Sequence, residues 1–425
     1  MNKVLVEFRV KNFRSLRDEQ VLSLVASKDK TLLDSHTQST GLKAAPHLLR
    51  SAVIYGANAS GKSNLIKALQ YMRGVVVESA TVIKPGQTYD RLRPFQLDSG
   101  SASEPTEFEI TFIFEKVRYQ YGFAMTKERI VSEHLLVYKA FKPQKWFERH
   151  FDEKSGKDVY IFGSGFKGSK NLWEGATRQN SLFLSMAAQL NSEVLRPVFE
   201  WITQRLVIFN EISPLIPEVA MRMLKQDEQR KAIRQFLLAA DISIADIEVV
   251  TKKVSGRTIS FDLTTGRREE GPTEHEVDEL KFHHETESGR AVFDLNDESS
   301  GTRNLLFLVG PVMDILNRGI TLVVDELGNS LHTHLVQALI RLFHRPDINV
   351  GGAQLIFSTH DTSLLDTYGL FRRDQIWFVE KKKDQSSELY GLTEFSPRKN
   401  EALERGYLQG RYGAIPIISG LMATR

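Results

Sequence analysis

The strongest constraint on this chain is the segment Gly56–Ser63, which matches the phosphate-binding pattern G-x-x-x-x-G-K-[ST]. The four residues before it, 52–55, are apolar and favour β structure, which predicts a buried strand. After it, apolar residues recur at helical spacing at Leu65, Ile66, Ala68, Leu69 and Met72. A strand, a glycine-rich turn and a helix in this order predict a fold built around a phosphate-binding loop.

The residue types in this loop explain how it would hold phosphate. Glycine lets backbone N–H groups close around phosphate oxygens, and the N-terminus of the following helix adds a favourable field. Lys62 is predicted to reach the β- and γ-phosphates, and the Ser63 hydroxyl to bind Mg²⁺. The predicted phosphate-binding residues are Gly56, Asn58, Ser60, Gly61, Lys62, Ser63 and Asn64. The alternative, a glycine-rich turn that binds nothing, does not account for both flanks.

Composition excludes several classes of protein. The 425 residues include no cysteine, which rules out disulfides, thiol catalysis and cysteine-ligated metal clusters. The net charge of +3 argues neither for nor against nucleic acid as a partner. No apolar run reaches the ~18 residues of a membrane span, and the N-terminus lacks the apolar run of a signal peptide. We therefore expect a cytoplasmic protein with no membrane partner.

The pattern of apolar residues divides the chain into three segments. Alternation at 4–24, 108–114 and 119–123 predicts antiparallel strands within residues 1–170, the segment that contains the phosphate-binding loop. Residues 171–295 are predicted to form a helical and β insertion, and residues 296–425 the last segment. A charge-rich stretch at 267–279 inside the insertion is predicted to be a solvated loop.

Two later apolar strands end in residues suited to nucleotide chemistry. The strand at 319–324 leads to Asp325, which is predicted to bind Mg²⁺, and to Glu326, which is predicted to polarise the attacking water. The strand at 354–357 leads to His360, and residues at such strand ends lie where α/β sheets bind ligands. His360 is therefore predicted to contact the γ-phosphate. The alternatives are an acidic surface turn and a packed histidine.

A third polar element opens a predicted helix. Small residues at a helix N-terminus suit anion capture, and here they are Ser299, Ser300, Gly301 and Thr302. Taken by itself, the pattern fits an ordinary helix cap as well.

Read in order, these elements resemble the ABC-type ATPase heads of the SMC, RecF and OLD proteins. The resemblance rests on the phosphate-binding loop, residues 299–302, Asp325-Glu326, Ser330-Leu331-His332 and Ser358-Thr359-His360. It implies an α/β P-loop NTPase fold, namely an ABC-type head with an antiparallel β layer in lobe one and a helical insertion. Lobe one is then residues 1–170, and lobe two is residues 296–425, with the signature helix, the Walker B strand and the switch histidine.

The same resemblance implies that ATP and Mg²⁺ are bound between two head-to-tail subunits. Residues 299–302 of one subunit would act on the γ-phosphate held by the other, and the same contact could build a higher oligomer. Because the segment departs from Leu-Ser-Gly-Gly-Gln, the serine that makes the contact stays open. Gln96 would be the Q-loop glutamine. His332 and His334 would belong to the D-loop, with a metal-binding pair as the alternative.

Further motifs resemble the compact bacterial ATPases of the RloA and AbiLi type, with the ATPase subunits of PARIS and Septu as more distant relatives. They are Asn12–Ser15, Arg372–Glu380, Ser387–Tyr390 and Gly410–Pro416. This likeness implies an ATP-hydrolysing switch or sensor in anti-phage defence, of the abortive-infection or toxin–antitoxin-like kind, that controls a separate effector nuclease or toxin. DNA or a phage-encoded factor would be the trigger. The alternative is a RecF-like DNA-binding repair ATPase.

Overall fold

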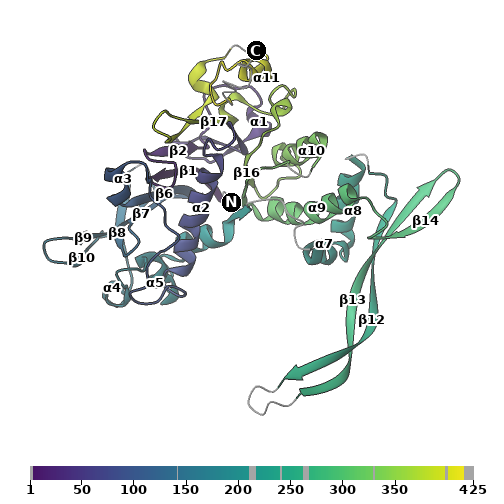
Figure 1. The fold of residues 1–425 in the computed structure, drawn as a ribbon, viewed down its shortest axis with the longest axis horizontal. Coiled ribbons are helices and arrows are strands. Elements are labelled where there is room, and N and C mark those ends of the chain that lie inside the picture. Colours follow the sequence, from purple (N-terminus) through teal and green to yellow (C-terminus); the bar gives the residue numbers. More distant parts are fainter. Residues whose placement is uncertain are drawn as a thin grey trace, which may run out of the picture. The chain divides into compact units, whose positions relative to one another are not determined.

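The computed structural model describes residues 3–140, 142–209, 217–239, 242–261, 268–328, 331–397 and 401–415 (Figure 1). The chain divides into two compact units. Unit 1 comprises Met1–Glu211 and Ile315–Arg425, and unit 2 comprises Ile212–Asp314. In the described part of the chain, no helix is both long and apolar enough to cross a membrane.

Unit 1 contains a seven-stranded antiparallel sheet in the order β10-β9-β8-β7-β6-β1-β2. Its strands are β1 (Lys3–Lys11), β2 (Gln20–Ser23), β6 (Thr106–Phe114), β7 (Val117–Met125), β8 (Ile130–Tyr138), β9 (Gln144–Asp152) and β10 (Lys157–Phe162). The pairing of β1 with β2, and of β6 with β7, confirms the predicted antiparallel layer. Alternate side chains of these strands are buried, as expected for a sheet with one face against the core.

The second sheet of unit 1 has six strands in the order β11-β15-β16-β5-β17-β18. They are β5 (Ser51–Tyr55), β11 (Leu206–Phe209), β15 (Thr321–Val324), β16 (Gln354–Ser358), β17 (Ile376–Lys381) and β18 (Ser387–Gly391). All neighbours pair in parallel except β17 with β18. Every residue of β5, β15 and β16 is buried, which explains why these strands are continuous apolar runs. Because β15, β16 and β5 are adjacent and parallel, their carboxyl ends meet at one edge.

Short helices and one long helix complete unit 1. They are α1 (Leu33–His36), α2 (Lys62–Glu78), α3 (Ser99–Ser103), α4 (Lys170–Ala176), α5 (Phe183–Gln189), α6 (Arg196–Glu200), the π-helix η1 (Trp201–Arg205), α10 (Thr333–His344) and α11 (Leu403–Leu408). The remaining elements are the 3₁₀ turns η2 (Thr362–Leu365), η3 (Arg373–Gln375) and η4 (Leu392–Phe395), and a small sheet of β3 (Thr37–Ser39) and β4 (His47–Leu49).

A buried glutamine joins the two sheets. Gln354, the first residue of β16, is fully buried. Its amide donates to the carbonyl of Leu5 in β1 at 3.0 Å and to that of Leu49 at 3.0 Å, and its Oε1 accepts from Leu5 N at 2.7 Å. Because these hydrogen bonds are satisfied only in one arrangement, the buried amide fixes the position of one sheet relative to the other.

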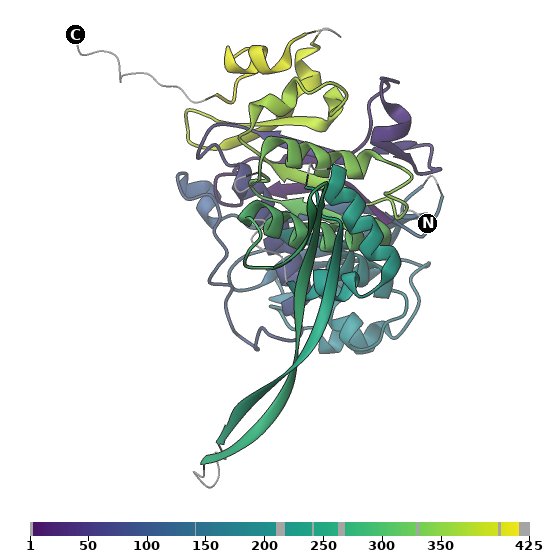
Figure 2. The same ribbon diagram turned by 90° about the vertical axis from the view of Figure 1, so that its right-hand side faces the viewer.

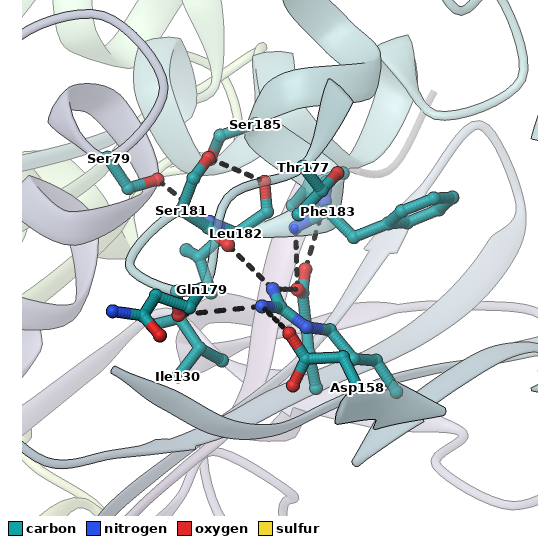
Figure 3. A network of polar contacts seen from close by, with 12 residues as sticks. Ser79, Ile130, Asp158, Thr177, Gln179, Ser181, Leu182, Phe183 and Ser185 are labelled. Carbon is teal, nitrogen blue, oxygen red and sulfur yellow. Dashed lines mark hydrogen bonds and ion pairs between the residues drawn. The ribbon is translucent and has the colours of Figure 1, made fainter. Parts of the chain in front are cut away.

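A buried ionic network holds the segment before α5 against the antiparallel sheet (Figure 3). Arg149 and Glu133 are fully buried, and Arg149 donates to Asp158 Oδ2 at 2.8 Å and to the carbonyl of Ser181 at 2.6 Å. The Glu133 carboxylate accepts from the backbone N–H of Phe183 at 2.6 Å. Ser185 in α5 then donates to a carbonyl of α2, so the network also supports the helix that follows the phosphate-binding loop.

Unit 2 consists of helices and a β ribbon. Its elements are α7 (Pro217–Leu224), α8 (Asp227–Ala239), β12 (Asp246–Phe261), β13 (Arg268–Thr286) and β14 (Gly289–Asp294), and it includes the start of α9 (Ser300–Arg318), which continues into unit 1. The β12–β13 ribbon twists along its length (Figure 2).

One expectation about unit 2 was wrong. The charge-rich stretch 267–279 is not a loop from Arg268 onward, because these residues belong to β13 and pair with β12. Arg267 lies outside the described residues. Glu274 and Glu276 are exposed, and an exposed two-stranded ribbon needs no apolar face, so the strand lacks the alternation that sequence analysis relies on.

The borders of the compact units also differ from the predicted segment borders at 170 and 295. Residues 171–209 pack in unit 1, where Trp201 stacks on Phe112 of β6 at a ring distance of 4.2 Å, and β11 pairs with β15. The division into lobe one, an insertion and lobe two at these borders therefore stays a prediction.

Candidate functional site

The phosphate-binding loop lies between the end of β5 and the start of α2, as predicted. Two of its residues have positive φ, Ala59 at 60° and Gly61 at 116°. A Cβ at Gly56 would lie 2.4 Å from the carbonyl oxygen of Val379, so only glycine fits between the loop and β17. Glycine at position 56 therefore allows the loop to pack closely against β17, and glycine at position 61 allows its positive φ.

Lys62 is the first residue of α2, and its ammonium group lies over the loop. Nζ donates to the carbonyl of Gly56 at 2.6 Å and to that of Ala57 at 3.1 Å. Burial lowers the pKa of Lys62 to about 8, and the charges of Asp325 and Glu326 oppose this shift. A partly desolvated ammonium group beside the loop attracts phosphate more strongly than a solvated one does.

The ends of β15 and β16 are joined by hydrogen bonds through Ser358. Its Oγ donates to Asp325 Oδ1 at 2.6 Å and accepts from the backbone N–H of Glu326 at 2.8 Å. Asp325 is buried, and Glu326 has a φ of 56°. A non-glycine residue in this conformation is strained, and such strain is concentrated at functional sites.

A pocket of about 230 Å³ brings most of the predicted residues together. Its lining residues are Asn58, Ala59, Ser60, Gly61, Lys62, Ser63, Asn64, Glu326 and His360. Glu326 Oε1 lies 3.7 Å from His360 Nε2. Residues from three adjacent strand ends therefore converge on one pocket, which is where an open α/β sheet binds its ligand.

Other predicted residues lie elsewhere. Gln96 is exposed, donates to the carbonyl of Pro94 at 3.2 Å and is not among the residues that line the pocket. Ser299 caps α9, because its Oγ accepts from the backbone N–H of Thr302 at 3.0 Å. Ser299, Ser300 and Gly301 are exposed at this helix start in unit 2. The structure thus shows the helix cap, and the signature role stays a prediction.

His332 and His334 lie close together after the end of β15. The rings of His332 and His334 are 5.1 Å apart, and His332 Nδ1 accepts from the backbone N–H of His334 at the start of α10. No group of three or more candidate ligands that could hold a metal ion occurs among the described residues. Ser330 of the predicted D-loop lies outside the described part of the chain.

Comparison with known proteins places this site in a family. Residues 51–366, well over half of the chain, match the family described as "AAA domain, putative AbiEii toxin, Type IV TA system". The chain belongs to this family. The matched range begins at β5 and includes the phosphate-binding loop, Asp325-Glu326 and His360. The family and the sheet order together confirm the predicted α/β P-loop fold with an antiparallel β layer.

One solved structure resembles this chain at low sequence identity. A crystal structure of the SmcHead bound to the C-winged helix domain of ScpA matches with 14% sequence identity and a TM-score of 0.41. The match covers 91% of this chain and 96% of the other. No curated protein matches the sequence.

Proposed function

We propose that this member of the family binds and hydrolyses ATP and works as a nucleotide-driven switch in anti-phage defence. The pocket that joins the phosphate-binding loop to Glu326 and His360 carries the proposal. The residues present suit a nucleoside triphosphate. The loop has no room for a Cβ at Gly56 or Gly61, so its backbone N–H groups stay accessible to phosphate, and the buried ammonium group of Lys62 lies beside it. Its lining residues include the Ser63 hydroxyl, a Mg²⁺ ligand of the kind such sites use.

Each residue has a distinct role in the proposed reaction. Lys62 holds the β- and γ-phosphates, and Ser63 and Asp325 hold Mg²⁺, with Ser358 fixing the orientation of Asp325. Bound Mg²⁺ would neutralise charge on the phosphates. Glu326 accepts a proton from the water that attacks the γ-phosphorus, the bond to the bridging oxygen breaks, and ADP and phosphate leave. His360 contacts the γ-phosphate from the neighbouring strand end.

The proposal is tested by measuring phosphate release from purified protein. We expect Mg²⁺-dependent hydrolysis of ATP, and a loss of at least ~100-fold in Lys62→Ala. The exposed Lys154→Ala, on the turn between β9 and β10, is the matched control and should retain full activity. A wild-type protein that neither binds nor hydrolyses ATP would overturn the proposal.

We further propose a second copy of the chain as partner, which completes the site with residues 299–302. Ser299, Ser300 and Gly301 are suited to this role because they are exposed at a capped helix start, and the buried Thr302 supplies the N–H that Ser299 caps. The test mixes two inactive variants, Lys62→Ala and Ser300→Arg. A mixed dimer contains one site with both an intact loop and an intact signature segment, so part of the activity should return. If the mixture stays inactive although both variants associate, the proposal that one subunit completes the site of the other is wrong.

The effector is proposed to be a separate nuclease or toxin. The family description, which names a toxin and a toxin–antitoxin system, supports a defence role. The experiment is co-expression with the product of the neighbouring open reading frame, followed by affinity purification with ATP and with ADP. A nuclease or toxin retained in only one nucleotide state would support control by the switch. Equal retention of the effector with ATP and with ADP would contradict control by the switch.

A further inference from the structure

Two of the four motifs in the second resemblance are Asn12–Ser15 near the start of the chain and Ser387–Tyr390 in its last segment. The structure brings them together beside the phosphate-binding loop. The backbone N–H of Ser387 donates to the carbonyl of Ser15 at 2.7 Å, and the two hydroxyl oxygens also lie 2.7 Å apart. Residues 372 positions apart in the sequence thus form one contact.

Both serines reach into the phosphate-binding loop. Ser387 Oγ donates to the carbonyl of Ser60 at 2.5 Å, and the Asn64 side-chain amide donates to Ser15 Oγ at 2.8 Å. A hydroxyl group has one proton, and the Ser60 carbonyl can only accept. Ser387 Oγ is the donor in both of its contacts, to the Ser60 carbonyl and to Ser15 Oγ, so these two acceptors share its one proton. The result is a chain of bonds from Asn64 through Ser15 and Ser387 to Ser60.

The same two side chains fill the space beside Gly61. A Cβ at Gly61 would lie 2.2 Å from Ser387 Oγ and 2.9 Å from Ser15 Oγ. Ser387 is only 2% exposed. Because the hydroxyls support the loop on the side where Gly61 has no side chain, a change in their position would move the backbone N–H groups that are expected to bind phosphate.

Ion pairs join the two segments that carry the serines, but these lie at the surface. Arg17 contacts Asp384 at 2.8 Å, and Lys382 contacts Asp18 at 3.9 Å, with all four side chains between 31% and 51% exposed. Exposed pairs of this kind contribute little to stability. The ion pairs therefore contribute little to the position of the loop, whereas the hydroxyl groups contact the loop directly.

We propose that Ser15 and Ser387 are positioning residues that hold the phosphate-binding loop in the shape that accepts the phosphates of ATP. The inference rests on the proposed function. It assigns a shared role to the motifs Asn12–Ser15 and Ser387–Tyr390. Neither serine is proposed to touch the nucleotide. Their effect passes through Ser60, Gly61 and Asn64.

The test measures KM and kcat for MgATP in Ser387→Ala, Ser15→Ala and the double variant. Loss of one buried hydrogen bond should raise KM about tenfold and leave kcat within about twofold, because Lys62 and Glu326 are untouched. The double variant should resemble the single ones, since both changes break the same chain of bonds. A hundredfold rise in the double variant would mean that the serines act independently and would overturn the shared role.

The neighbouring residue Ser386 supplies a matched control. It is equally buried, at 1% exposed, but its hydroxyl donates to Asp384 and not to the loop. Ser386→Ala should therefore keep the wild-type KM. If Ser387→Ala and Ser386→Ala have the same KM, the positioning role is wrong, even if both lower the melting temperature. If Ser387→Ala does not fold, the partly exposed Ser15→Ala decides the question alone. Absence of ATP binding by the wild-type protein would instead contradict the proposed function.

Discussion

Glu326 and His360 face each other in the pocket, with 3.7 Å between Glu326 Oε1 and His360 Nε2. They come from the ends of adjacent parallel strands, β15 and β16, which are bonded to each other through Ser358. A carboxylate and an imidazole held in this way beside a phosphate-binding loop suit water activation on one side and contact with the γ-phosphate on the other.

Glu326→Gln is expected to abolish turnover and to preserve ATP-dependent association. The amide is nearly isosteric with the carboxylate but cannot accept the proton of the attacking water, so ATP would bind and remain intact. Phosphate release and light-scattering mass with ATP are the measurements. Glu153→Gln, at an exposed turn, is the control. Normal turnover by Glu326→Gln would refute the assigned role.

Affinity for ATP is expected to fall as pH rises through the pKa of Lys62. This pKa is lowered to about 8 by burial, so the ammonium form is lost progressively between pH 7 and 9. We expect about tenfold weaker binding at pH 9 than at pH 7, measured by calorimetry with a non-hydrolysable ATP analogue, which leaves the charge of Glu326 in place. In a Lys62→Arg protein the guanidinium stays charged, so the affinity should not change over this range. Equal pH dependence in both proteins would exclude Lys62 as its source.

Arg149→Met is expected to destabilise unit 1 by about 3–5 kcal/mol, because it leaves the Glu133 carboxylate buried without its cationic partner. Burial already raises the pKa of Glu133, and the charge of Arg149 opposes that rise. Urea denaturation measures the effect. The double variant Glu133→Gln/Arg149→Met should be more stable than the single one, because no buried charge then remains. A double variant as unstable as the single one would show that packing, not charge, is responsible.

Stability is expected to fall in mild acid because of a buried histidine pair. The rings of His36 and His344 are 3.9 Å apart, and His344 Nε2 lies 2.8 Å from the Ser51 hydroxyl at the start of β5. Burial lowers the pKa of His36 to about 4 and that of His344 well below its usual value. The unfolded chain therefore binds more protons than the folded one between pH 6.5 and 4, and stability falls as pH decreases through this range.

For His36 alone, the pKa difference corresponds to about 3 kcal/mol. Urea denaturation at pH 7 and pH 4.5 measures it. His36→Gln should reduce the difference in unfolding free energy between the two pH values, whereas the exposed His275→Gln should leave it unchanged. A His36→Gln protein with unaltered acid sensitivity would assign the effect to other groups.

The sequence predicted the strands correctly where burial on both faces of the sheet produces a continuous apolar run. Residues 52–55 and 319–324 were recognisable as buried strands because a parallel strand covered on both faces is apolar throughout. The sequence predicted a loop where β13 forms, because the residues of this exposed ribbon are charged and show no apolar alternation. It also assigned no role to Ser358, whose importance depends on two partners from the adjacent strand end.

By itself, the sequence determined that a glycine-containing turn follows a buried strand and opens a helix, because the apolar run before Gly56 and the helical spacing after Lys62 are local patterns. Only the tertiary structure decided what surrounds it. The order of β15, β16 and β5 in the sheet brings Glu326 and His360 to Lys62, and the pairing of chain ends brings Ser15 and Ser387 to Gly61. The physical reason is that spacing along the chain encodes local periodicity, whereas contacts between distant segments arise when strands pair and bury their apolar faces together.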